Sequence, residues 1–154
     1  MLEDSGPQED LLKGALAGLI AAGISAAAWA AIALVTDSQF GIVAIAIGAF
    51  VGLAVRWAGH GRSIAAGIVG AACSLLAIAA GNVLAVAVLV ARELGVPLTD
   101  VLALIDFDIV WQVLTEDFSF LDGVFYAFAL YEGFRFALVP APKIAAPAPQ
   151  APIA

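Results

Sequence analysis

The sequence has very few residues of the kinds that build catalytic or metal sites. It contains one cysteine, Cys73, within an apolar stretch, and one histidine, His60. A single cysteine leaves no disulfide framework and no metal-ligand spacing, and a histidine without a second ligand makes a poor metal site. There is also no Ser/His/Asp set, no H-E-x-x-H motif and no phosphate-binding glycine loop. We therefore predict no enzyme activity, no cofactor and no metal.

Charged residues are scarce as well. They make up only 12% of the 154 residues, against 64% hydrophobic residues, and the mean hydropathy is +1.07. Because a soluble globular domain carries about 25% charged residues, this chain has too little polar surface to be one. Its six lysines and arginines form no basic patch, which argues against nucleic acid as a partner.

Long uncharged runs occupy much of the first two thirds of the chain, at positions 14–36, 38–55 and 63–91. A helix that crosses a bilayer needs about 20 predominantly apolar residues. The sequence therefore predicts an integral membrane protein. Acidic residues precede the first run, where a cleaved signal peptide would be basic, so we interpret this run as a permanent helix.

The predicted fold is an all-α membrane bundle of four transmembrane helices, at about 11–35, 40–57, 63–91 and 121–139. The fourth span is the least apolar, because it contains Asp122, Glu132 and Arg135 among its aromatic residues. At about 1.5 Å of rise per residue, the third span is longer than a hydrocarbon core of about 30 Å. It must tilt, protrude or break at Gly81 and Asn82.

Three further segments flank the spans. Residues 97–117 are too charged to cross a membrane, because of Asp106 and Asp108, and too apolar for a free loop. We predict an interfacial amphipathic helix here, or two short ones. Residues 1–10 are predicted to form an acidic N-terminal tail, and the proline- and alanine-rich residues 140–154 a disordered tail.

The positive charges predict the orientation of the bundle. Cytoplasmic loops carry an excess of lysine and arginine. If both termini and the loop 58–62 are cytoplasmic, only Arg92 lies outside, and five basic residues lie inside: Lys13, Arg56, Arg62, Arg135 and Lys143. We therefore predict a multi-pass protein of a bacterial inner membrane with cytoplasmic N and C termini.

Small residues recur at regular spacing along the first three predicted spans. They are Gly14, Gly18 and Ala22; Ala44, Gly48 and Gly52; and Gly67, Ala71 and Ser74. In lipid, such stripes let helix backbones approach closely. We assign helix packing to Gly14, Gly18, Gly48, Gly52 and Gly67. The alternative is that glycine and alanine are merely abundant in this chain.

The strongest polar cluster consists of Arg56, Arg62, Glu132 and Arg135, at the predicted cytoplasmic ends of the helices. Glu132 can pair with Arg135, three residues further along the same helix, or with Arg56 across the bundle. An ionisable residue within a membrane is a candidate functional site. The alternatives are a structural ion pair that joins helices and a proton or ligand site. Asn82 is interpreted as a kink or an interhelical hydrogen bond.

Residues 41–62 carry a helix and turn motif, G-x-x-V-G-x-x-V-R-x-x-G-x-G-R, matched at Gly48, Val51, Gly52, Val55, Arg56, Gly59, Gly61 and Arg62. This segment resembles a family of small, uncharacterised bacterial multi-pass membrane proteins. Residues 126–136 look like the last helix of that family. Some members carry an N-terminal zinc ribbon, which this chain lacks because it has no cysteine there. The resemblance implies a multi-pass membrane protein and no particular activity.

These features predict a non-enzymatic membrane protein whose partners are the lipid bilayer and either further copies of itself, in a homo-oligomer, or other membrane subunits. Its function would be that of a structural or accessory subunit. The alternative is a small channel or transporter with a polar site at the cytoplasmic ends of the second and fourth helices. The two differ in whether Glu132, Arg56 and Asn82 line a hydrated path or pack in a dry interior.

Overall fold

The computed structural model of the protein describes residues 8–36, 42–116 and 118–138, and within these ranges it is helical, without strands. Three helices are long and apolar enough to cross a membrane: α1 (Leu11–Thr36), α2 (Ile42–Gly59) and α3 (Ile64–Leu94). The predictions of an all-α chain and of helices of membrane-spanning length are confirmed. The predicted C-terminal tail, 140–154, and residues 1–7 of the N-terminal tail lie outside the described residues.

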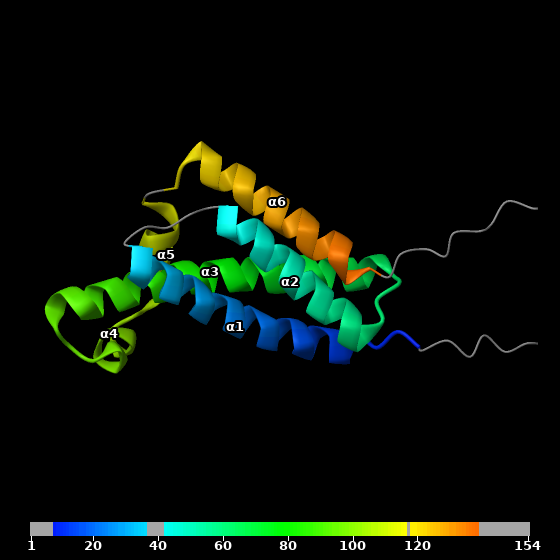
Figure 1. Cartoon of the computed structure of the whole chain (residues 1–154), viewed down its shortest axis with the longest axis horizontal. Coiled ribbons are helices and arrows are strands. Elements are labelled where there is room, and N and C mark those ends of the chain that lie inside the picture. The colour runs from blue at the N-terminus through cyan, green and yellow to red at the C-terminus, as the bar shows by residue number, and fades with distance from the viewer. Residues whose placement is uncertain (1–7, 37–41, 117, 139–154) are drawn as a thin grey trace, which may run out of the picture.

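Three shorter helices follow, α4 (Leu98–Ala103), α5 (Phe107–Thr115) and α6 (Phe120–Ala137). Figure 1 shows α1, α2, α3 and α6 side by side, with α4 and α5 gathered at one end of the bundle. The chain passes along the bundle four times, so α1 begins at the end where α6 finishes. We refer to this end as the basic end, because Lys13, Arg56, Arg62 and Arg135 lie there, and to the other as the α4–α5 end.

α3 is continuous over 31 residues, without a break at Gly81 and Asn82. Ser63 caps its N-terminus by accepting a hydrogen bond from the Ala66 N–H, and Gly95, in the left-handed region at φ 65°, ends it. Glycine adopts this conformation without a steric penalty. Gly81 instead provides space for Trp29 of α1, whose Cβ would lie 3.3 Å from an added Cβ. The long third span was predicted to tilt, to protrude or to break at Gly81 and Asn82, and the structure excludes the break.

The segment predicted to form one interfacial helix or two short ones contains two helices, α4 and α5. The Asp106 carboxylate accepts a hydrogen bond from the Ile109 N–H at 2.9 Å and so starts α5 as an N-cap. Neither α4 nor α5 contains a buried residue, and Phe107 and Trp111 stack on the outside of α5 with ring centroids 6.5 Å apart. About half of the apolar side chains of these short helices are exposed, and the others are only partly buried.

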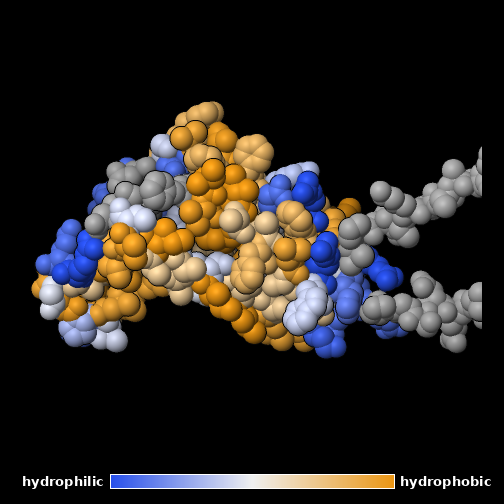
Figure 2. Space-filling view, in the orientation of Figure 1, coloured by the Kyte–Doolittle hydropathy of each residue, from blue (hydrophilic) through white to orange (hydrophobic). Residues whose placement is uncertain are grey.

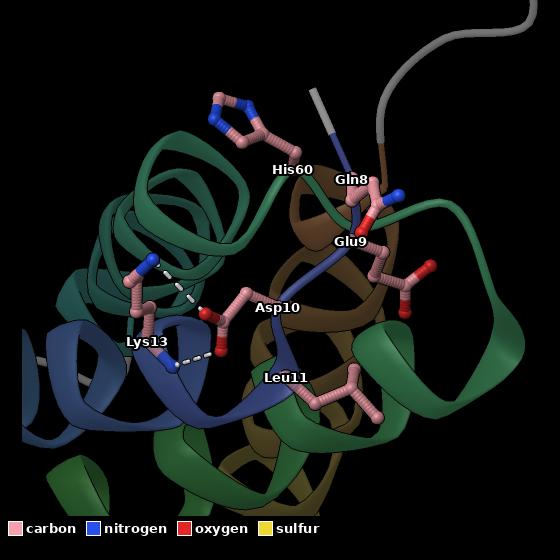
Figure 3. A pocket seen from close by; sticks show the side chains of 6 residues that line it. All are labelled: Gln8, Glu9, Asp10, Leu11, Lys13 and His60. Atoms are coloured by element: carbon pink, nitrogen blue, oxygen red, sulfur yellow. Dashed lines mark hydrogen bonds and ion pairs between the residues drawn. The ribbon is translucent and has the colours of Figure 1, made fainter. Parts of the chain in front are cut away.

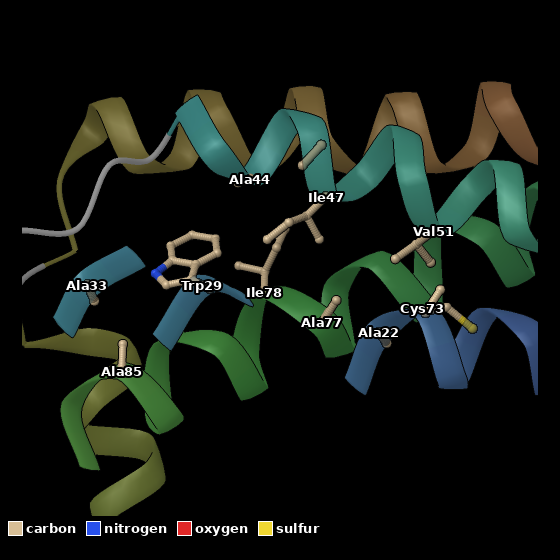
Figure 4. Close-up of a cluster of buried hydrophobic side chains, with 12 residues drawn as sticks. Ala22, Trp29, Ala33, Ala44, Ile47, Val51, Cys73, Ala77, Ile78 and Ala85 are labelled. Atoms are coloured by element: carbon tan, nitrogen blue, oxygen red, sulfur yellow. The ribbon is translucent and has the colours of Figure 1, made fainter. Parts of the chain in front are cut away.

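The core of the bundle is apolar and made largely of small residues. Trp29 of α1, Ile47 of α2 and Ile78 of α3 point toward one another between the helices (Figure 4). Buried alanines fill most of the remaining space, which brings the helices close. Figure 2 shows hydrophobic residues over the long sides of the bundle and hydrophilic residues gathered toward its two ends. This distribution is typical of a protein that lies in a bilayer.

Candidate functional site

The basic end contains the sequence-predicted cluster, but the structure divides it into separate groups. Glu132 and Arg135 lie together on α6, where Arg135 Nε is 3.5 Å from Glu132 Oε2. The two partners differ in exposure, since the Glu132 side chain is 19% exposed and the Arg135 side chain 56%. The Arg135 guanidinium also lies 4.8 Å from the centroid of the Phe136 ring, within the range of a cation–π interaction.

One carboxylate oxygen of Glu132 lacks a hydrogen-bond donor. Its Oε2 is buried and accepts no hydrogen bond, although it lies within ion-pair distance of Arg135. A buried carboxylate oxygen normally has a donor, because removing it from water otherwise costs free energy. This is the clearest unsatisfied polar atom in the described part of the chain.

Arg56 does not pair with Glu132. It occupies the last turn of α2 and, among the described residues, forms no ion pair or side-chain hydrogen bond. Gly52, one turn earlier, packs against Gly133 and Phe136 of α6. Phe136 therefore lies against α2 one turn before Arg56, and its ring lies beside the Arg135 guanidinium.

Arg62 belongs to a different group, formed with the N-terminal segment. The Glu9 carboxylate accepts hydrogen bonds from the Arg62 N–H at 3.0 Å, the Ser63 N–H at 2.9 Å and the Ser63 hydroxyl. The hydroxyl, followed by the Arg62 N–H, lowers the pKa of Glu9 below its usual value. Asp10 donates its backbone N–H to the Gly59 carbonyl at 2.9 Å. Residues 9 and 10, which belong to the predicted acidic N-terminal tail, form hydrogen bonds with the α2–α3 connection.

An open hollow of about 680 Å³ adjoins this connection, lined by Gln8, Glu9, Asp10, Leu11, Lys13 and His60 (Figure 3). Lys13 Nζ lies 3.1 Å from Asp10 Oδ2, and the Lys13 N–H donates to Asp10 Oδ1. These contacts with Lys13, led by the N–H, lower the pKa of Asp10. In the described residues no group of three or more His, Cys, Asp or Glu could hold a metal ion.

The five glycines assigned to packing all lie against neighbouring helices of the same chain. A Cβ added to Gly48 would collide with the Ala129 carbonyl, and one added to Gly52 would lie 2.6 Å from the Gly133 carbonyl. Added Cβ atoms at the other three would meet residues of α2, α3 or α6: Val55 for Gly14, Val55 and Cys73 for Gly18, and the Phe134 ring for Gly67. The glycine faces are therefore occupied within one molecule.

The other half of this packing, on α6, was not predicted from the sequence. Ala129, Gly133 and Ala137 form a buried stripe on α6, and added Cβ atoms on Gly70 and Gly133 would collide with Gly133 and Ser74 respectively. The spacing of four residues from 129 to 137 is the signal that would have revealed the stripe. It was obscured by the large aromatic residues between its members.

Asn82 and Ser74, two of the buried polar side chains in the interior, form hydrogen bonds. The Asn82 side-chain amide donates to the Ile78 carbonyl of its own helix and to the Tyr126 hydroxyl of α6, each at 2.9 Å. Asn82 therefore makes an interhelical hydrogen bond and does not kink α3. The Ser74 hydroxyl donates to the Gly70 carbonyl at 2.8 Å. The Asn82 hydrogen bond to Tyr126 joins α3 to α6, whereas the Ser74 hydrogen bond to Gly70 lies within α3.

The class of protein follows from the three long apolar helices and their apolar exterior, which indicate a membrane protein of the helical-bundle type. Comparisons of the chain with protein-family models, with curated proteins and with solved structures found no match. No matched protein therefore tests the motif at 41–62, and the resemblance of this segment to a family of bacterial membrane proteins remains a proposal.

Proposed function

We propose that this chain is a non-enzymatic structural or accessory subunit of a bacterial inner membrane, acting as a homo-oligomer or with other membrane subunits. The supporting observation is the tight closure of its interior, where α6 packs between α2 and α3 through glycine and alanine. Backbones this close leave little room for a hydrated path through one molecule. The resemblance at 41–62 fits a small multi-pass protein of this kind.

In this proposal α6 is the fourth transmembrane helix. Its 18 residues extend about 27 Å at 1.5 Å per residue, close to the hydrocarbon thickness of about 30 Å. It runs in register with α2, since Gly48 meets Ala129 and Gly52 meets Gly133. α4 and α5 then lie at the outer interface, and the basic end lies in the cytoplasm by the positive-inside rule.

The glycine faces assigned to helix packing are used within the chain, so association requires another surface. α1 offers one, because Gly23, Ala27 and Ala31 form a second stripe of small residues that is exposed. An added Cβ on Gly23 would meet nothing within 4 Å. A stripe of this kind on a lipid-facing helix suits packing against another transmembrane helix.

The test is the mass of the purified protein in mild detergent, measured by light scattering, for the wild type and for Gly23→Leu. We expect an assembly larger than one chain that dissociates in Gly23→Leu. Ile24→Leu, a volume-conserving change at the neighbouring exposed position, is the control and should keep the wild-type mass. A wild type that is strictly monomeric, also after gentle cross-linking in membranes, would contradict the homo-oligomer.

A second candidate function rests on Glu132. Its buried Oε2 lacks a hydrogen-bond donor, a state that a bound proton or cation would relieve. The chain would then be a small transporter or channel with its polar site between α2 and α6 at the basic end. Proteoliposomes that carry a proton or potassium flux lost in Glu132→Gln would favour this candidate, whereas the structural subunit predicts no such flux.

A further inference from the structure

The cations at the basic end are unequally balanced by acids. Lys13 is paired with Asp10, and Arg62 lies beside the Glu9 carboxylate, which binds its backbone. Of the remaining two arginines, Arg135 is paired with Glu132, whereas Arg56 has no acidic partner among the described residues. In the described part of the chain, the α2–α6 side of this end therefore keeps one uncompensated positive charge.

The side chains around the two arginines match the two parts of a phospholipid, a charged headgroup and apolar acyl chains. Phe128 and Tyr131 lie seven and four residues before Arg135 and so share its face of α6, while Leu53 lies three residues before Arg56 on α2. These three side chains are all exposed. Each arginine thus follows an apolar exposed surface along its helix, with the cation at the end of the bundle and the apolar residues toward its middle.

The aromatic residues mark the same level of the membrane. Trp57, next to Arg56, is 85% exposed, and Tyr131 is exposed one turn from Arg135. Exposed tryptophan and tyrosine concentrate at the headgroup region of a bilayer. The arginines, placed beside them, lie where phosphate groups of lipids are found.

We propose that Arg56 and Arg135 bind the phosphate of an anionic phospholipid at the seam between α2 and α6, with its acyl chain along Leu53 and Phe128. Arginine suits this role because its planar guanidinium donates two parallel hydrogen bonds to phosphate oxygens. The occupant is a lipid rather than a free phosphate, because the apolar surface adjoins the cations directly. Basic sites between transmembrane helices on the cytoplasmic side bind such headgroups.

This inference uses the placement of α6 beside α2 in the bilayer but does not depend on the subunit role or the oligomeric mass. A lipid-binding monomer would overturn the homo-oligomer alone, and an oligomer indifferent to anionic lipid would overturn the lipid site alone. The two proposals can therefore fail separately.

The test is a thermal-shift titration of the full chain in neutral mild detergent with phosphatidylglycerol, and with phosphatidylcholine of the same acyl chains. We expect phosphatidylglycerol to raise the melting temperature of the wild type at concentrations where phosphatidylcholine does not. Arg56→Gln should weaken the apparent affinity by about tenfold, the loss of one good charged contact, while Arg56→Lys retains most of it. Glycerol phosphate, which lacks acyl chains, should give no shift.

Lys13→Gln is the matched control, because it removes a positive charge at the same end that is already paired with Asp10. It should leave the phosphatidylglycerol affinity unchanged. An equal loss in Lys13→Gln and Arg56→Gln would overturn the proposal in favour of unspecific attraction. Equal shifts by both lipids, or a shift by glycerol phosphate alone, would also overturn it.

Discussion

Glu132 and Arg135 differ in exposure to solvent, and this difference determines which substitution destabilises the fold more. Arg135, 56% exposed, remains hydrated without its partner, whereas Glu132, 19% exposed, does not. Removing one partner of an ion pair is costly when the group left behind is buried, and nearly free when that group is exposed.

We therefore expect Glu132→Gln to change the free energy of unfolding by about 1 kcal/mol or less, and Arg135→Gln to destabilise by more, about 2 kcal/mol. Chemical denaturation in detergent measures both. A joint substitution of the two residues should recover most of the loss of Arg135→Gln, since no buried charge then remains. If Glu132→Gln were the more damaging change, the carboxylate would have a role that this ion pair does not explain.

Gly48 is the glycine whose added methyl group would come closest to the backbone of another helix, at the carbonyl of Ala129. Gly48→Ala should force α2 and α6 apart and destabilise the fold by about 1–3 kcal/mol, the usual cost of overpacking. The matched control is Gly23→Ala, where an added Cβ meets open space and the outer stripe stays small. This control should be neutral or slightly stabilising, because alanine is the better helix former. Equal melting temperatures for the two variants would contradict the packing.

At the scale of elements, the N-terminal segment is fastened to the α2–α3 connection by the Glu9 carboxylate. The pKa of Glu9 is lowered in the folded state, chiefly by the Ser63 hydroxyl. A lowered pKa means that the stabilisation is present above the unfolded value of about 4.3 and is lost as the pH falls through the lower, folded value.

Melting temperatures recorded from pH 6 down to about pH 3 test this contact. The wild type should lose stability below about pH 4.3, and Glu9→Gln should lack that part of the loss while melting lower at neutral pH. Glu93→Gln, at the other end of the bundle, serves as the control and should follow the wild-type profile. A profile of Glu9→Gln that coincides with the wild type throughout would show that the carboxylate fastens nothing.

The bounds of the long helices could be predicted from sequence, because they depend on local signals. Predicted and observed ends of α1, α2 and α3 differ by at most three residues, since apolar runs stop at charges and Gly95 ends α3. The sequence left open whether residues 97–117 form one helix or two short ones, and the structure has two. Asp106 was interpreted as a charged interruption, whereas its carboxylate caps a new helix.

For the whole molecule, the sequence indicated which residues were small but not which helices they would join. Gly48 and Gly52 face α6 because α6 enters between α2 and α3, a long-range arrangement that no local pattern encodes. The same holds for the site. The spacing of Glu132 and Arg135 predicted that they could pair. Arg62 instead contacts Glu9, which lies more than fifty positions away in the sequence, and spacing alone could not predict this contact.

The central claim for the whole molecule is that the chain crosses the membrane four times, with the basic end in the cytoplasm. Sidedness of labelling by an impermeant thiol reagent tests it most directly, in single-cysteine variants made in a Cys73→Ala background. His60→Cys and Leu138→Cys, at the basic end, should react only from the cytoplasm. Asp106→Cys and Phe120→Cys, at the α4–α5 end, should react only from outside. Reaction of positions 120 and 138 from the same side would contradict a fourth span, and the reverse sidedness of all four would contradict the orientation.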